Sequence, residues 1–124
     1  MMEGIENMAR DDYHVIVYQI LAYLYQQLKK GEPIDGKQIS MNSDFFSINE
    51  RYWKYIIVNM YNEGLISGIV LREVNAIGTD SEIAILKLDR CEITPKGIEY
   101  LTNNSFIEKA KGFFKEAKEM IPFI

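Results

Sequence analysis

Residues 13–30 form an apolar segment that reads as one long α-helix. At about 100° per residue its apolar side chains cover nearly the whole circumference, and only Gln19 and Gln26 form a clean polar strip. Gly31 suits a left-handed C-terminal cap, and Pro33 follows it, as is typical after a helix end. A helix that is apolar nearly all round must be covered from more than one side. We therefore expect it at the centre of the domain or against a partner chain.

The length of 124 residues allows one domain with a single moderate core. No apolar run approaches the ~18–20 residues that a membrane-spanning helix requires. The acidic residues 1–12 lack the apolar region of a secretory signal, and we expect them to form a flexible lead-in. Cys91 is the only cysteine, so it cannot form an internal disulfide, which fits a reducing cytoplasm. These features predict a small cytoplasmic domain.

Two shorter helices are expected after the first. Residues 36–40 indicate a short helix within a loop. Ser47 and Glu50 have the spacing of a capping box, in which the serine accepts a hydrogen bond from the backbone of the glutamate and the carboxylate reaches back. This pattern predicts a helix that opens at the box, runs to Glu63 and stops at Gly64.

A β-ribbon is expected next. Residues 65–74 and 83–93 are rich in β-branched and apolar side chains, which favour strands, and residues 75–82 separate them like a long hairpin loop. The alternation of apolar side chains in the second run changes parity near residues 89–90. We therefore expect a bulge or a break in the strand there.

The remaining segment predicts two helices. Thr94 is a good N-cap and Pro95 suits the first helical position, so a short helix opens there. Ser105 and Glu108 repeat the capping-box spacing and open a final amphipathic helix that we place at residues 105–124.

The order helix, short helix, capped helix, β-hairpin, helix, helix is that of a winged-helix domain, an α+β fold with a wing of two to three strands. We place this domain at residues 13–104 and treat residues 105–124 as an extra C-terminal helix for packing or dimerisation. The helix that opens at residues 47–50 is then the recognition helix, and residues 75–82 form the tip of the wing.

The segment from Ile93 to Leu101, ITPKGIEYL, resembles the strand-to-helix junction of many bacterial winged-helix regulators. The further positions that carry a family resemblance are Asn104, Ser105, Lys109, Ala110 and Pro122. With them, over roughly residues 13–122, the chain resembles the YjcQ-like family of small bacterial and phage winged-helix proteins. The resemblance implies a winged-helix fold and brings no catalytic residues with it.

The outward face of the expected recognition helix is free of acidic residues, which stand only at its edges as Glu50 and Glu63. In a major groove, arginine pairs with guanine, asparagine pairs with adenine, and a valine methyl meets the thymine methyl. Lysine and tyrosine can hold phosphates and fix the register. With the one basic residue near the wing tip, the candidate DNA-binding residues are Arg51, Lys54, Tyr55, Val58, Asn59, Asn62 and Arg72.

The charge of the chain opposes this interpretation. The sequence has 14 basic and 18 acidic residues, a formal net charge of −4, and no segment is strongly basic. Proteins that neutralise DNA phosphates usually carry a basic patch. Near the wing tip, Arg72 stands beside Glu73, Asp80 and Glu82. Two interpretations stay open: a DNA-binding transcriptional regulator with a strictly local site, and a winged-helix scaffold for protein–protein contact without DNA binding.

The C-terminal helix carries more apolar residues than one small domain easily covers. We expect it to form a homodimer interface, which would also present two recognition helices to a palindromic site. The alternatives are packing on its own domain and, less favoured because acids dilute its lysines, lying on a membrane surface. The candidate interface residues are Phe106, Ile107, Ala110, Phe113, Phe114, Ala117 and Ile121.

The sequence lacks catalytic and metal-binding patterns. His14 is the only histidine and has no dyad or triad partner patterned around it, so we expect a half-buried structural residue. Cys91 is expected to be buried filler, with a redox sensor as the alternative. One cysteine and one histidine cannot assemble a zinc site, and no phosphate-binding glycine motif or nucleophile elbow occurs. We expect no enzyme, no cofactor and no metal, and no small-molecule site is evident.

Overall fold

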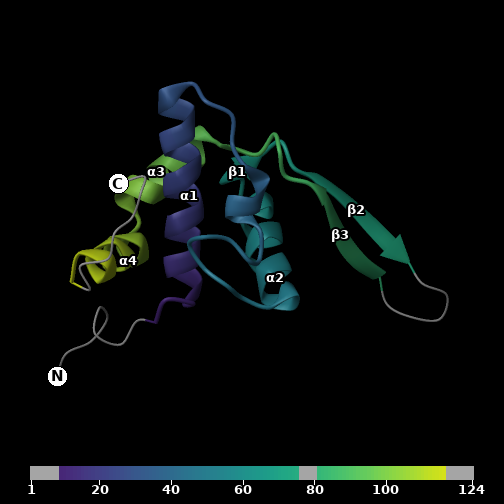
Figure 1. Cartoon of the computed structure of the whole chain (residues 1–124), viewed down its shortest axis with the longest axis horizontal. Coiled ribbons are helices and arrows are strands. Elements are labelled where there is room, and N and C mark those ends of the chain that lie inside the picture. The colour runs from purple at the N-terminus through teal and green to yellow at the C-terminus, as the bar shows by residue number, and fades with distance from the viewer. Residues whose placement is uncertain (1–8, 76–80, 117–124) are drawn as a thin grey trace.

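Figure 1 shows a computed structural model of the chain, which describes residues 9–75 and 81–116. The described residues form an α+β domain with a winged-helix layout, as the order of elements predicts. The elements are α1 (Tyr13–Lys30), the 3₁₀ helix η2 (Gly36–Ile39), α2 (Glu50–Asn62), β1 (Ile66–Ser67), β2 (Val70–Asn75), β3 (Ser81–Lys87), β4 (Glu92–Ile93), α3 (Pro95–Asn103) and α4 (Ser105–Glu116).

Helix α1 stands at the centre, with α3 and α4 on one side and α2 on the other (Figure 1). This confirms the place expected for a helix that is apolar nearly all round. Its predicted polar strip is an exception, because Gln19 is buried and its Nε2 donates a hydrogen bond to the carbonyl of Phe45 at 3.2 Å. The helix ends as predicted at Gly31, which has a φ of 70° in the left-handed region.

The chain before α1 is tied to α2. The hydroxyl of Tyr52 on α2 donates a hydrogen bond to the carbonyl of Asp11 at 2.6 Å, and the backbone N–H of Asp12 donates to the carbonyl of Ala9 at 3.0 Å. Residues 9–12 of the predicted lead-in therefore form a turn, and residues 1–8 lie outside the described residues.

Both predicted capping boxes are wrong, because an asparagine caps each helix instead. Asn49 has an extended backbone, and its Oδ1 accepts a hydrogen bond from the N–H of Tyr52 at 2.8 Å. Ser47 lies two residues too early and pairs in a β-bridge with Asn42. In α4 the Oδ1 of Asn104 accepts from the N–H groups of residues 106 and 107, so Ser105 is already helical.

The expected β-ribbon is split into two antiparallel pairs, β1 with β4 and β2 with β3. The break predicted at residues 89–90 is confirmed as a turn between β3 and β4. A second break, at Gly68 between β1 and β2, was not predicted. Gly68 has a φ of 81°, and a Cβ there would collide with the carbonyl oxygen of Arg90. The β2–β3 hairpin then projects away from the rest of the domain (Figure 1). Pairing extends to Asn75 and Ser81, one residue beyond the predicted first strand and two residues before the predicted second strand, and residues 76–80 of the tip lie outside the described residues.

Trp53 joins α2 to the segment that precedes it. Its side chain is buried, and its Nε1 donates a hydrogen bond to the carbonyl of Ile39 at 2.8 Å. A buried indole that has found a partner for its N–H contributes apolar area without an unsatisfied donor. This contact fixes how α2 lies on the core. No helix in the described part of the chain is long and apolar enough to cross a membrane.

Candidate nucleic-acid interface

The face of α2 opposite the core is open to solvent. The core side of α2 consists of Trp53 and three aliphatic side chains one or two turns further on. On the far side Arg51, Tyr55 and Asn62 are exposed, and Tyr55 has 61% of its surface accessible. The predicted helical periodicity is therefore confirmed for these three residues, which the fold brings to one face.

Lys54 is only half exposed and has an acidic neighbour. Its Nζ lies 3.5 Å from Oε2 of Glu50, one helical turn earlier. Exposed pairs of this kind contribute only about 0–1 kcal/mol, so a phosphate group can replace the carboxylate as the partner of the ammonium group. Lys54 therefore stays a candidate for a phosphate contact, with Glu50 as its competitor.

Asn59 and Val58 are half-buried, which the sequence does not predict. The Nδ2 of Asn59 donates a hydrogen bond to the carbonyl of Tyr55 at 2.7 Å, within its own helix. A bidentate contact with adenine uses both the amide N–H and the amide oxygen. The Asn59 amide N–H is therefore already hydrogen-bonded, whereas the predicted contact with adenine requires it to be free. Asn62 is better placed, because its side chain makes no hydrogen bond within the described residues.

Acidic groups border this face at both ends. Burial, together with the nearby Asp11 and Asp12 carboxylates, raises the pKa of the Tyr52 hydroxyl at the N-terminal end of α2. At the C-terminal end Glu63 lies close enough to raise the pKa of Tyr100, after the larger effect of burial. The basic residues of the face, Arg51 and Lys54, lie near the N-terminal end of α2, with Glu50 in the same part of the helix.

A shallow pocket of about 370 Å³ lies at the start of α2, lined by Asn49, Arg51, Tyr52 and Tyr55. Sequence reasoning missed Asn49 and Tyr52 as parts of this surface. The sequence feature that could have identified them is their position at the helix N-terminus, where the capping residue and the first turn both face outward. The pocket gives the Arg51 side chain an aromatic neighbour on the surface.

Arg72 lies apart from the α2 residues. It is exposed on β2 and pairs across the hairpin with Ala84. Val74 follows it on the same side of the strand, since side chains alternate, and is 44% exposed. The hairpin that carries these residues diverges from α2 (Figure 1). Among its described residues, the wing therefore has one arginine, which lies next to exposed apolar side chains.

Two of the residues predicted for the dimer interface on α4 are turned inward. Ile107 and Ala110 have no accessible surface, because they pack inside the chain's own core. This corrects their assignment to an interface and agrees with the alternative in which α4 packs on its own domain. Phe106 stays 50% exposed, and Phe113 is half-buried against the core. The side chain of Phe114, and residues Ala117 and Ile121, lie outside the described residues.

The two reactive residue types occupy structural positions. Burial lowers the pKa of His14, and the nearby Glu63 carboxylate opposes this shift. Cys91 is buried, and burial, with a smaller effect of Glu92, raises the pKa of its thiol to about 12. The described residues contain no group of three or more histidine, cysteine, aspartate or glutamate side chains that could hold a metal ion.

A model of the family described as YjcQ protein matches residues 18–120, which is well over half of the chain. The chain belongs to the YjcQ family. This confirms the resemblance drawn from the ITPKGIEYL segment and the positions after it. No curated protein and no solved structure matches this YjcQ-family chain. The match identifies the family, and what the chain can bind depends on the chemistry of the α2 face.

Proposed function

We propose that this YjcQ-family chain binds double-stranded DNA through the outward face of α2 and acts as a transcriptional regulator in the cytoplasm. The observation that supports this most is the exposure of Arg51, Tyr55 and Asn62 on one face of a winged-helix recognition element, opposite the buried Trp53 side. In this fold the second helix of the motif lies in the major groove and contacts base edges there.

Each exposed side chain has a role that fits its chemistry. Arg51 presents a planar guanidinium that can donate two parallel hydrogen bonds to a guanine. Asn62 can read an adenine with its unengaged amide. Lys54 exchanges the Glu50 carboxylate for a phosphate, and the Tyr55 hydroxyl donates to a neighbouring phosphate. Arg72 on the wing adds a contact with the DNA backbone.

The net charge of −4 sets the conditions under which such binding occurs. Two or three cations neutralise only a few phosphates, and the acidic residues at both ends of α2 repel the rest of the DNA backbone. Affinity is therefore expected to be low in the absence of the correct sequence and to fall as salt rises.

A gel shift with random genomic duplex fragments at low and moderate salt tests the proposal. The double variant Arg51→Glu/Lys54→Glu is expected to weaken binding by about tenfold or more. The matched control Lys30→Glu/Lys111→Glu makes the same change in net charge at exposed residues on α1 and α4. Equal losses in both variants would show a non-specific charge effect and remove α2 as the reader, as would unchanged binding in the α2 variant.

We also propose that two copies associate through the exposed side of α4, which would place two α2 helices on one palindromic site. Phe106 supports this because it is 50% exposed while its neighbours Ile107 and Ala110 are buried. Sedimentation equilibrium is expected to show a dimer that Phe106→Ser weakens. A monomer at all concentrations would contradict this.

A second function is supported by the wing. Val70, Val74 and Leu86 are each between 43% and 50% exposed on the β2–β3 hairpin, which is more apolar surface than a DNA-binding wing requires. A winged-helix scaffold that binds another protein through its wing would use this surface. In that case the chain would show no gel shift with any duplex at low salt.

A further inference from the structure

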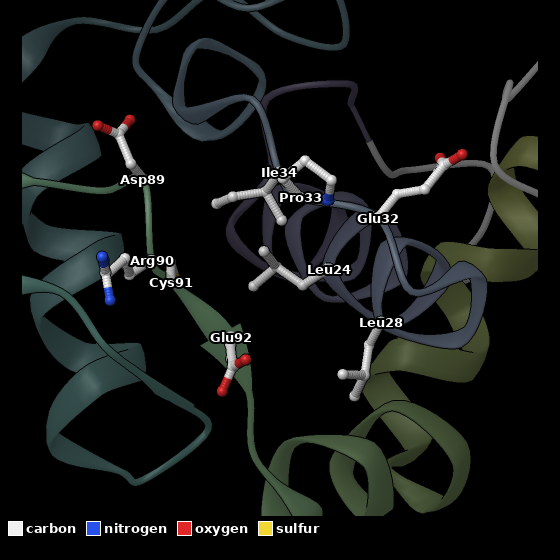
Figure 2. Close-up of a pocket in the computed structure, with 9 residues that line it drawn as sticks. All are labelled: Leu24, Leu28, Glu32, Pro33, Ile34, Asp89, Arg90, Cys91 and Glu92. Atoms are coloured by element: carbon white, nitrogen blue, oxygen red, sulfur yellow. The ribbon is translucent and has the colours of Figure 1, made fainter.

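A pocket of about 400 Å³ lies at the opposite end of α1 from the start of α2. Three segments build it: the last turns of α1, residues 32–34 after the helix, and residues 89–92, which join β3 to β4 (Figure 2). Its volume falls within the range of about 300–1,000 Å³ that small-molecule sites occupy.

The inner surface of this pocket is apolar. Leu24 and Cys91 are buried at its base, and Ile34 is half-buried beside them. Leu28 completes the apolar surface and remains 48% exposed, although it belongs to the central helix. Figure 2 shows Leu24 in the middle of the opening, with Ile34 and Leu28 on two sides of it. An apolar group seated here would cover Leu28 and gain about 25 cal/mol for each Å² removed from water.

The edge of the pocket carries a net negative charge. Its charged side chains are Glu32, Asp89 and Glu92, against Arg90. None of the four forms an ion pair within the described residues. In Figure 2 the Arg90 guanidinium turns away from Leu24, whereas Glu92 lies below Leu24, with Leu28 to its right. An apolar surface bordered by unpaired carboxylates attracts a cation and disfavours an anion.

We propose that this pocket binds a small lipophilic cation, an amine or ammonium compound with one apolar group. The apolar group lies on Leu24, Leu28 and Ile34, and the cationic nitrogen lies at the edge beside the Glu92 carboxylate. Charge complementarity identifies the class of ligand: the apolar lining alone would accept any apolar molecule, and the carboxylates select among them by charge. The proposal stands independently of DNA binding, since none of the pocket residues belongs to α2.

Three probes of equal shape and different charge test this: 4-phenylbutylamine, 4-phenylbutanol and 4-phenylbutyrate. Each is titrated into the full chain at low salt while backbone amide signals are followed by NMR. The amine is expected to bind several-fold more tightly than the alcohol, and the carboxylate most weakly, with shifts at Leu28, Cys91 and Glu92. Equal binding of all three, shifts elsewhere, or no shifts would overturn the proposal.

Two variants separate the parts of the site. Glu92→Gln is expected to reduce the preference for the amine over the alcohol without changing how the alcohol binds. Leu28→Ser is expected to weaken the amine and the alcohol together, and its exposure makes it safe for folding, which Trp53 fluorescence checks. Glu73→Gln, an exposed acid on β2 outside the pocket, is the matched control. The assignment fails if Glu92→Gln behaves like Glu73→Gln.

Discussion

The imidazole of His14 in α1 stacks on the ring of Phe106 in α4, with the ring centroids 4.7 Å apart and the planes inclined by 16°. Tyr13 packs its ring edge-to-face against the same imidazole at 5.0 Å and reaches Tyr55 of α2 at 6.1 Å. A continuous row of aromatic rings thus connects α2 to α4. The only histidine of the chain lies in this row, so its titration can be followed without signals from other histidines.

We predict that His14 titrates below its ordinary pKa of 6.5, because burial disfavours the imidazolium and Glu63 offsets this only in part. The unfolded chain then takes up the proton first as the pH falls. The contribution of His14 to stability is complete above about pH 6.5 and is lost as the pH falls from there towards the folded pKa. NMR titration of the imidazole protons gives the pKa directly.

Two variants complete this test. His14→Gln should flatten the part of the unfolding free energy that depends on pH below neutrality. Glu63→Gln should lower the pKa of His14 further, since the opposing carboxylate is gone. A His14 pKa at or above 6.5 would contradict the prediction, because it would show that burial does not outweigh the Glu63 carboxylate.

We predict that Gly97→Ala destabilises the domain by about 1–3 kcal/mol. A Cβ at this position in α3 would collide with the carbonyl oxygen of Leu65 and lie 2.7 Å from Cγ1 of Ile93, so backbone has to move. Urea unfolding followed by Trp53 fluorescence measures the change. Gly31→Ala is the comparison, because nothing lies within 4 Å of its Cβ and only its positive φ costs energy. A smaller loss at Gly97 than at Gly31 would contradict the close packing of α3 on this strand.

We predict that Cys91 is unreactive towards a thiol reagent at mildly alkaline pH in the folded protein. The side chain is buried, so the reagent cannot reach the sulfur. Because the thiol pKa is raised to about 12, almost no thiolate is present at that pH. The thiol should react at once when urea unfolds the chain. Rapid labelling of the native protein would favour the redox-sensor alternative instead.

The order and type of the elements could be predicted because they depend on local patterns. Gly31 ends α1 and Thr94 caps α3 as expected, since each acts within a few residues of itself; the Thr94 hydroxyl accepts from the N–H of Gly97 at 2.9 Å. The caps at Asn49 and Asn104 were missed because asparagine and serine compete for the same backbone donors. Which one wins depends on the backbone conformation before the helix.

Burial of particular side chains could not be predicted where tertiary packing decides. The periodicity of α4 shows that Ile107 and Ala110 share an apolar face, but not that this face meets α1 of the same chain. On α2 the periodicity found Arg51, Tyr55 and Asn62. The periodicity could not show that the Asn59 amide forms a hydrogen bond within its own helix, because the side-chain rotamer determines this.

The measurement that tests the role of α2 most directly is an amide NMR titration of the full chain with a short mixed-sequence duplex at low salt. We predict that the signals of Arg51, Tyr55 and Asn62 shift, that those of Arg72 on the wing follow, and that all shifts shrink as salt is added. Unchanged α2 signals, with shifts confined to other surfaces or missing altogether, would contradict the proposed DNA-binding face.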